Sequence, residues 1–218
     1  GDVYKRQAVN DESLIYNVGK RIGVHAKRIG VHINFAPVTD INTNPNNPII
    51  GSRSFGEDKL SVTNKSLSYL KGMQSEGIMG SAKHFPGHGD TSTDSHKTLP
   101  TINFSAKRIN EVELFPYKKL IDNNLSSVMV AHMEVPSLEK EPKMPSTLSK
   151  NIISKLLKKK LKFEGLVITD AMDMKGVVDF NKNQSADVSA LLAGNDILLM
   201  PDDLDLSLIH ISEPTRRR

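Results

Sequence analysis

Five short apolar runs recur along the chain, separated by longer segments in which apolar and polar residues mix. The runs are VHINFAPV (31–38), IMGSAKHF (78–85), SSVMVAH (126–132), GLVITD (165–170) and DILLM (196–200). Continuous apolar stretches of this length are typical of strands that are buried on both faces of a parallel sheet. The pattern therefore predicts five parallel strands.

The segments between the runs show helical spacing. Apolar residues recur with this spacing at Leu14, Val18, Ile22 and Ile29 in one segment and at Leu67, Leu70 and Met73 in another. Each set places an apolar stripe on one side of a helix. Two further helices are predicted at 105–123 and 149–161, the second with Ser149 as a candidate N-cap. A shorter helix is predicted at about 185–193, before Gly194.

Strands that alternate with helices indicate an α/β fold with one parallel sheet, either a closed barrel or an open doubly wound sheet. No run is followed by a G-x-G-x-x-G turn, and polar residues follow at least four runs, at 40–58, 84–96, 132 onward and 170–173. A barrel builds its site from many βα loops, whereas a doubly wound sheet concentrates the site at one switch point. The sequence therefore predicts a TIM-type (β/α)8 barrel. Because a complete barrel needs about 250 residues, we expect an incomplete one with about five to six βα units.

Both ends of the chain look foreign to the rest. They read GDVYKRQ (1–7) and LSLIHISEPTRRR (206–218). Residues 2–7 and 206–216 can be encoded by nearly reverse-complementary DNA that resembles a transposase adapter of sequencing libraries. We therefore expect residues 8–205 to form a partial barrel domain and both flanks to be non-native, to be set aside as a tag would be.

Charge and composition narrow the classes of function. The formal net charge is +4, of which the flank 1–7 contributes +1 and the flank 206–218 contributes +2, so residues 8–205 carry +1. The charge is then no indication of a nucleic-acid partner, and KLLKKKLK (155–162) is interpreted as a solvated helix face. The absence of cysteine excludes disulfides and thiolate chemistry. No apolar run approaches the roughly 20 residues that a membrane-spanning helix needs.

The segment KHFPGHGDTSTDSH (83–96) concentrates histidines, aspartates and hydroxyl groups. Lys83 and His84 stand at the exit of a predicted strand, and the rest extends over the barrel mouth, where its two glycines are expected to make the loop mobile. Asp94 and His96 lie two residues apart, so in an extended stretch they face the same side. A hydrogen bond donated there by the imidazole to the carboxylate would make a general acid/base. An Asx turn at Asp94 with an exposed His96 fits the spacing equally well.

Asp170 ends the apolar strand in GLVITDAMDM. A carboxylate at the carboxyl end of a barrel strand projects into the site. There it could attack an anomeric carbon or stabilise an oxocarbenium ion. The motif alone leaves open that Asp170 is an N-cap for the next helix.

Arg53 and His132 are candidates for ligand binding. Arg53 lies in GSRSFGED, and its guanidinium suits sugar hydroxyls or a carboxylate. A structural ion pair with Glu57 or Asp58 is the alternative. His132 follows SSVMVA and either lines the barrel mouth or is a hydrogen-bonded core histidine.

Together GSRSFGED, KHFPGHGDTSTDSH and VITDAMDM resemble glycoside hydrolase family 3, in particular the bacterial β-N-acetylglucosaminidases of the NagZ type. The similarity covers nearly all of 8–205, and the long loop motif is highly specific. The resemblance implies that 8–205 belong to the N-terminal catalytic barrel of that family. It also implies a bacterial protein of the cytoplasm or periplasm.

The resemblance further implies the roles of single residues. Asp170 would be the nucleophile, His96 the general acid/base and Asp94 its dyad partner. The non-reducing N-acetylglucosamine (GlcNAc) would be held by Lys83, His84 and Arg53, with His132 added by its position. The implied substrates are GlcNAc-containing saccharides or muropeptides of cell-wall recycling, without cofactor or metal. Because the family's first strand supplies a further sugar-binding aspartate that this stretch lacks, we expect the isolated stretch to be inactive.

Other functions stay open. Within the family, a β-glucosidase is the nearest rival, and a GlcNAc phosphorylase would use phosphate in place of water. A metal-dependent hydrolase would use four ligands from the loop: His84, His88, Asp90 and His96. Pro86 and Gly87 argue against a helix there, so the ligand geometry of H-E-x-x-H is absent. A non-catalytic sugar-binding protein is disfavoured because nucleophile and dyad are both present.

Overall fold

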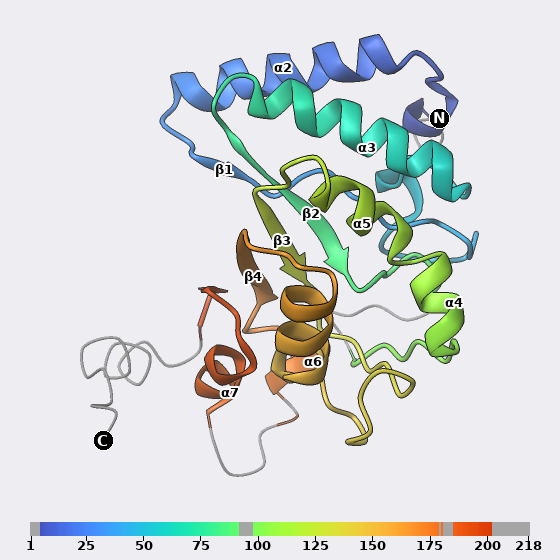
Figure 1. The fold of residues 1–218 in the computed structure, drawn as a ribbon, viewed down its shortest axis with the longest axis vertical. Helices are drawn as coiled ribbons and strands as arrows, with labels where there is room; N and C mark the ends of the chain where they lie inside the picture. The colour runs from blue at the N-terminus through green and yellow to red at the C-terminus, as the bar shows by residue number, and fades with distance from the viewer. Residues whose placement is uncertain (1–4, 92–97, 179, 181–184, 202–218) are drawn as a thin grey trace.

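The computed structural model describes residues 5–91, 98–178, 180 and 185–201 (Figure 1). In this part of the chain one sheet holds β1 Ile33–Asn34, β2 Met79–Phe85, β3 Ser127–Val130, β4 Leu166–Ala171 and β5 Ile197–Leu199. Neighbouring strands are all parallel, and their order in the sheet is their order in the chain. Each crossover thus moves one strand further in the same direction, whereas a doubly wound sheet reverses at its switch point. The predicted incomplete α/β barrel is confirmed as a half-barrel of five strands.

Helices connect the strands and pack against the sheet (Figure 1). They are α1 Lys5–Ala8, α2 Glu12–Arg28, η1 Gly51–Arg53, α3 Lys59–Gln74, α4 Ala106–Glu111, α5 Phe115–Ile121, η2 Ser146–Leu148, η3 Asn151–Lys160, α6 Lys175–Val178 and α7 Ala186–Ala193. The short η1 and η2 are 3₁₀-helices, and η3 is a π-helix. The helices predicted before the first and second strands and at 185–193 are confirmed as α2, α3 and α7.

The single helix predicted at 105–123 is wrong, because two short helices, α4 and α5, occupy that segment. Pro116 lies in the first turn of α5. A proline has no backbone N–H to donate and its ring clashes with the preceding turn, so a continuous helix cannot run through this position. Residues 112–114 therefore form a corner between the two helices.

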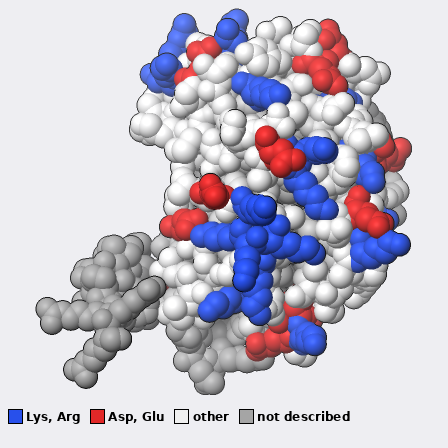
Figure 2. Space-filling view, viewed as in Figure 1, with Lys and Arg blue, Asp and Glu red and all other residues white. Residues whose placement is uncertain are grey.

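The helix predicted at 149–161 is η3, and the Ser149 hydroxyl accepts a hydrogen bond from the amide of Ile152 at 3.2 Å. Its lysines form an exposed basic face that continues onto α5, as Figure 2 shows. Lys158 is the exception, because its ammonium lies 2.8 Å from a carboxylate oxygen of Asp196. The predicted solvated helix face is confirmed.

Helices α2 and α3 pack closely through glycine. A Cβ added to Gly19 would clash with the Tyr69 carbonyl, and one added to Gly72 would clash with the Tyr16 carbonyl. Ile15 of α2 is buried in a cluster with Val62 of α3, whereas Leu14 and Val18 face elsewhere and are 50% and 46% exposed. They line an apolar hollow of about 370 Å³ that opens beside Arg53 and Lys83 of the candidate site.

The main core lies between the sheet and its helices. It contains Leu70, Met73, Tyr117, Leu120, Val128, Val130, Ile152, Leu157 and Val167 among its fully buried members. Within the described residues, none of the helices combines the length and apolarity needed to cross a membrane.

Candidate active site

Polar side chains gather at the carboxyl ends of β1 to β4, as expected for the catalytic face of a barrel. After β1 the chain continues beside β2, with the Thr39 amide donating to the Lys83 carbonyl at 2.7 Å. This pairing brings Asp40 next to His84. Asp170 is the penultimate residue of β4, and His132 follows β3.

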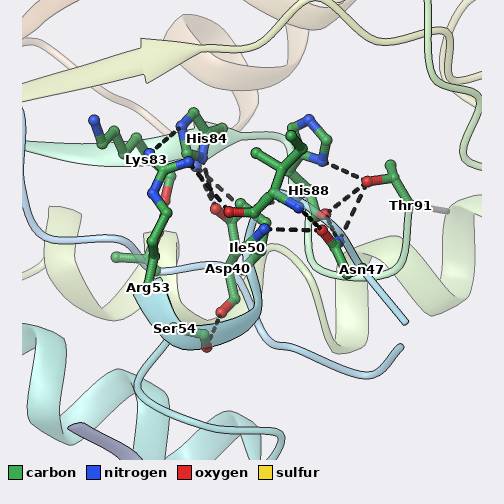
Figure 3. Close-up of polar contacts among 11 residues, drawn as sticks. Asp40, Asn47, Ile50, Arg53, Ser54, Lys83, His84, His88 and Thr91 are labelled. Atoms are coloured by element: carbon green, nitrogen blue, oxygen red, sulfur yellow. Dashed lines mark hydrogen bonds and ion pairs between the residues drawn. The ribbon is translucent and has the colours of Figure 1, made fainter. Parts of the chain in front are cut away.

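Asp40 lies at the centre of the hydrogen bonds that join the loop after β1 to the end of β2 (Figure 3). Its carboxylate is buried and accepts from His84 Nδ1 at 2.7 Å, from the His84 amide at 3.1 Å and from the His88 amide at 2.7 Å. Burial alone would raise the pKa of Asp40, but the charge and hydrogen bond of His84, with the contribution of His88, hold it below its usual range. The ionised carboxylate therefore fixes the His84 ring with the proton on Nδ1.

The second ring nitrogen of His84 faces Arg53. Arg53 ends η1, and its Nη2 lies 3.5 Å from His84 Nε2 while Nη1 donates to the Ile49 carbonyl at 3.4 Å. When the ring is neutral, this tautomer leaves the lone pair on Nε2, where it accepts from the Arg53 guanidinium. The pair thus presents one acceptor and a fork of donors, a set that suits the vicinal hydroxyls of a sugar.

Lys83 brings a second cation to the same place. Burial and the neighbouring Arg53 charge lower the pKa of Lys83, while the Asp170 and Asp40 carboxylates act in the opposite direction. The ammonium therefore lies within electrostatic range of both carboxylates. The arrangement brings together three of the predicted binding residues, Lys83, His84 and Arg53, near Asp170.

The start of the long loop is bound to the loop after β1. Asn47, itself buried, donates to the His88 carbonyl at 2.8 Å, and the Thr43 hydroxyl donates to Asp90 Oδ1 at 2.9 Å. A Cβ on Gly89 would clash with the Ile41 carbonyl, and Gly87 has φ +132. In this part of the loop the glycines serve close packing and a left-handed turn, rather than the mobility that the sequence suggested. Asp94 and His96 lie outside the described residues.

His88 lies deeper in the same loop. Its ring contacts the His84 ring edge to face, with centroids 5.7 Å apart, and its Nδ1 lies 2.6 Å from Thr91 Oγ1. Burial lowers the pKa of His88, although the Asp40 charge opposes the shift. The ring is therefore a neutral structural element of the loop.

At the end of β4, Asp170 is partly exposed and its Oδ1 accepts from the amide of Ala171 at 3.0 Å. His132 is fully buried beside it, with Nε2 2.8 Å from the Ala171 carbonyl oxygen and Nδ1 2.7 Å from Thr147 Oγ1. Of the two interpretations open from the sequence, this geometry favours the hydrogen-bonded core histidine over a residue that lines the mouth.

The metal-site alternative needs its four ligands close together. Over the described ranges, no group of three or more histidine, aspartate and glutamate side chains could hold a metal ion, and the fourth proposed ligand, His96, lies outside those ranges. The imidazole Nδ1 atoms of His84 and His88 are already bonded to Asp40 and Thr91.

Sequence reasoning did not assign Asp40 and Asn47. Asp40 carried a signal, because it follows an apolar strand at the point where a barrel strand exposes its residues to the site. Asn47 lies in NTNPNNP, a composition that indicates a turn and nothing about which carbonyl its amide contacts.

Comparison with known proteins gives consistent matches. A family model described as glycosyl hydrolase family 3 N terminal domain matches residues 5–212. Among curated proteins, beta-hexosaminidase A of Pseudoalteromonas piscicida is 38% identical over 194 residues, which is 84% of this chain and 32% of that protein. The chain thus spans about a third of the length of this relative.

Solved structures match over most of the chain. A glycoside hydrolase family 3 beta-N-acetylglucosaminidase from Paenibacillus sp. str. FPU-7 superposes with a TM-score of 0.86 at 38% identity, covering 91% of this chain and 38% of that one. The beta-glucoside phosphorylase BglX bound to 2FGlc superposes with a TM-score of 0.88 at 28% identity, covering 94% and 38%.

Proposed function

Because the chain belongs to glycoside hydrolase family 3, we propose that its barrel carries the active site of a retaining exo-β-N-acetylglucosaminidase. The observation that supports this most strongly is the position of Asp170 at the end of β4, within electrostatic range of Lys83. Lys83, His84 and Arg53 form a binding surface next to a carboxylate that is free to attack. The relatives named beta-hexosaminidase and beta-N-acetylglucosaminidase support the class of sugar.

In the proposed first step, an Asp170 oxygen attacks the anomeric carbon of a terminal GlcNAc. The glycosidic C–O bond breaks, and the leaving oxygen takes a proton from His96. This forms a glycosyl ester on Asp170. The Lys83 ammonium lies within electrostatic range of Asp170.

In the second step, water attacks the same carbon from the face that the leaving group left. His96, now neutral, takes the proton from that water, and the bond to Asp170 breaks. Two inversions give net retention at the anomeric carbon. Asp94 would hold the His96 ring in one tautomer and stabilise the imidazolium that forms.

The proposed binding geometry follows from the Asp40 network. Because Asp40 holds the proton on His84 Nδ1, the Nε2 atom accepts from a sugar hydroxyl, while Arg53 and Lys83 donate to sugar oxygens. We infer that the natural substrates are GlcNAc-terminated muropeptides, such as GlcNAc linked β-1,4 to 1,6-anhydro-N-acetylmuramic acid. His132 is left out of this set because both of its ring nitrogens are bonded to protein groups.

A phosphorylase is the second candidate. The similarity to a beta-glucoside phosphorylase favours it, and a neutral imidazole base does not repel an anionic acceptor as a carboxylate would. The two reactions differ only in whether water or phosphate opens the glycosyl ester. Sugar 1-phosphate formed in phosphate buffer would identify the phosphorylase, and its absence at millimolar phosphate would leave the hydrolase.

The direct test compares aryl β-N-acetylglucosaminide with aryl β-glucoside on the complete polypeptide that carries this sequence. We expect preferential cleavage of the N-acetyl substrate, and we expect His96→Ala to slow poor leaving groups much more than good ones. Preference for the glucoside would assign the chain to the β-glucosidases of the family. Loss of activity with a chelator would instead favour the metal-dependent hydrolase.

We also propose that residues 8–205 are the native part of the barrel domain and that 1–7 and 206–218 derive from adapter DNA. Residues 2–7 and 206–216 can be encoded by nearly reverse-complementary DNA, which supports this division. Sequencing the source DNA without transposase adapters should give different residues at both ends, and the same residues would refute it.

A further inference from the structure

The backbone around Asp170 leaves the regular ladder of the sheet. Strands β3 and β4 pair as far as Val130 and Thr169, one residue before Asp170. On the other side, the register between β4 and β5 shifts between Ile168 and Ala171. Irregular pairing of this kind is frequent beside active sites, where it re-aims a side chain. The carbonyl of Ala171 therefore has no ladder partner on β3.

His132 supplies the missing partner. Its Nε2 lies 2.8 Å from the Ala171 carbonyl oxygen, and its Nδ1 lies 2.7 Å from Thr147 Oγ1. A carbonyl oxygen only accepts, so Nε2 must carry the proton, and Nδ1 then accepts from the Thr147 hydroxyl. The fold thus fixes one tautomer of a fully buried imidazole.

A further hydrogen bond anchors the other end of this chain. The Thr147 carbonyl accepts from Asn195 Nδ2 at 2.8 Å, and the same amide donates to the Ala190 carbonyl at 2.6 Å. Asn195 follows α7, and Thr147 lies in η2. Both η2 and α7 therefore hold the Thr147 residue that contacts the His132 ring.

On the opposite edge of β4, the chain near Asp170 is held by hydrogen bonds from β5. The Leu199 amide donates to Thr169 Oγ1 at 3.0 Å, and the Met172 amide donates to the Leu199 carbonyl at 2.8 Å. The Thr169 side chain before Asp170 and the Ala171–Met172 peptide after it are thus held from β5. From the β3 side, His132 holds the carbonyl of that same Ala171–Met172 peptide, because the β3–β4 ladder has already ended.

We propose that His132 is a positioning residue for the nucleophile, its Nε2–H holding the Ala171 peptide so that Asp170 faces the anomeric carbon. This rests on the proposed role of Asp170. Burial lowers the pKa of His132, although the Ala171 backbone and the Asp170 charge oppose the shift, and the neutral ring has the one donor and one acceptor that the geometry needs. His132 acts through the backbone and does not touch the sugar.

Two amide substitutions separate positioning from packing. The amide nitrogen of glutamine reaches the position of Nε2, whereas that of asparagine reaches only the position of Nδ1. His132→Gln keeps the donor to Ala171 and His132→Asn loses it. The probe is a 5-fluoro GlcNAc fluoride, which traps the glycosyl ester and needs little acid catalysis because fluoride leaves readily. We expect His132→Asn to slow trapping by about 10- to 100-fold with little change in the dissociation constant, and His132→Gln to stay within about threefold of the parent.

A second pair tests the tautomer without changing the histidine. Thr147→Val removes the donor to Nδ1 at nearly constant volume, so the ring is free to place its proton there and turn a lone pair toward the Ala171 carbonyl. Thr147→Ser keeps the hydroxyl. We expect Thr147→Val to slow trapping by about tenfold and Thr147→Ser to leave it unchanged. This pair also decides the matter if a His132 variant fails to fold.

The outcomes separate the two levels of the argument. Equal trapping in the two amide variants and in the two Thr147 variants would overturn the positioning role, because the imidazole would then only fill space. Undiminished turnover by Asp170→Ala would instead overturn the proposed function itself. Slow trapping in His132→Asn and Thr147→Val, with the parent rate in their partners, supports the proposal.

Discussion

At the end of β2, hydrogen bonds from several segments converge on one buried carboxylate, whereas at the end of β4 the proposed nucleophile is held mainly through the backbone near it. Asp40 accepts from two amides and one imidazole and so ties His84 to the long loop. Within the described residues, the bond given for Asp170 comes from the next amide along its own chain. The proposed binding half, around Asp40, is therefore fixed by charge, and the proposed reacting half, around Asp170, by strand geometry. A carboxylate that must form and break a bond to carbon needs free oxygens, and this arrangement leaves them.

Removing the Asp40 carboxylate should have the largest effect on the free energy of unfolding. Asp40→Ala leaves three buried donors without an acceptor, and we expect it to lower the free energy of unfolding by about 3–5 kcal/mol. Asp40→Asn keeps the shape but turns an amide N–H toward His84 Nδ1, which moves the imidazole proton to Nε2 and against Arg53. Urea denaturation measures both variants. Equal and small losses would show that the network does not depend on the charge.

The charge of Asp40 also gives this comparison a pH dependence. Its pKa is lowered in the folded protein from the usual 3.8. The stability that it contributes is therefore present above pH 3.8 and is lost as the pH falls through the lower folded-state pKa. The difference in unfolding free energy between the parent and Asp40→Asn should be smaller at pH 3 than at pH 5. A constant difference at pH 3 would contradict this account.

Gly89→Ala should disturb the packing of the loop after β2 against the loop after β1. The added Cβ meets the backbone of Ile41, so one loop must shift, and we expect a cost of about 1–3 kcal/mol together with weaker substrate binding. Gly77→Ala is the matched control. Gly77 has φ +81 and open space around it, so its cost should be backbone strain of about 1 kcal/mol without any effect on binding. Thermal unfolding and KM measure the two effects, and equal KM changes would refute the packing argument.

Arg53→Lys should sharpen the difference between binding and chemistry. The substitution keeps the charge but loses the planar fork, and we expect KM to rise about tenfold, as for the loss of one charge-assisted hydrogen bond, with a smaller change in kcat. Arg28→Lys, on the exposed end of α2, is the control and should change neither. A fall in kcat with constant KM would place Arg53 in the chemical step instead.

The smallest expected effect is at Glu113, which lies under Gly87. Burial raises the pKa of Glu113, although its bond to Arg108, 3.1 Å long, opposes the shift. The folded state thus disfavours the ionised form, so this group stabilises below its usual pKa of 4.5 and loses that contribution as the pH rises through the folded value. Glu113→Gln should leave the melting temperature unchanged or slightly higher at pH 7, with no gain at pH 4. A clear loss at pH 7 would show that the ion pair dominates.

The strands and the barrel could be predicted because a strand that is buried on both faces of a parallel sheet requires a continuous run of apolar residues. β2 and β4 lie within the predicted runs or one residue beyond them. The helix at 105–123 was less predictable, since its apolar spacing continues across the corner and only Pro116 marks the break. Helix α2 shows a different limit, because the side that packs on α3 is chosen by small residues such as Gly19, while Leu14 remains exposed.

The residues of the candidate site also fall into those that the sequence pointed to and those that it did not. Sequence patterns could single out four candidate residues because they stand at strand ends or in loops whose position the barrel dictates: Lys83, His84, Arg53 and Asp170. The role of Asp40 depends on a partner 44 residues away, and that of His132 on Thr147 and the Ala171 carbonyl. Such pairings are set by strand register and by where the ladder ends, which no local pattern records.

The most direct test of the central claim is to trap the glycosyl ester with the fluorinated GlcNAc fluoride and locate the label by peptide mass spectrometry. The account predicts one labelled residue, Asp170, and no labelling of Asp170→Ala, whose turnover should fall by on the order of 10⁴-fold. Added azide should then restore cleavage in Asp170→Ala and yield the α-glycosyl azide, because one inversion replaces two. A label on another carboxylate, or full turnover by Asp170→Ala, would contradict the account.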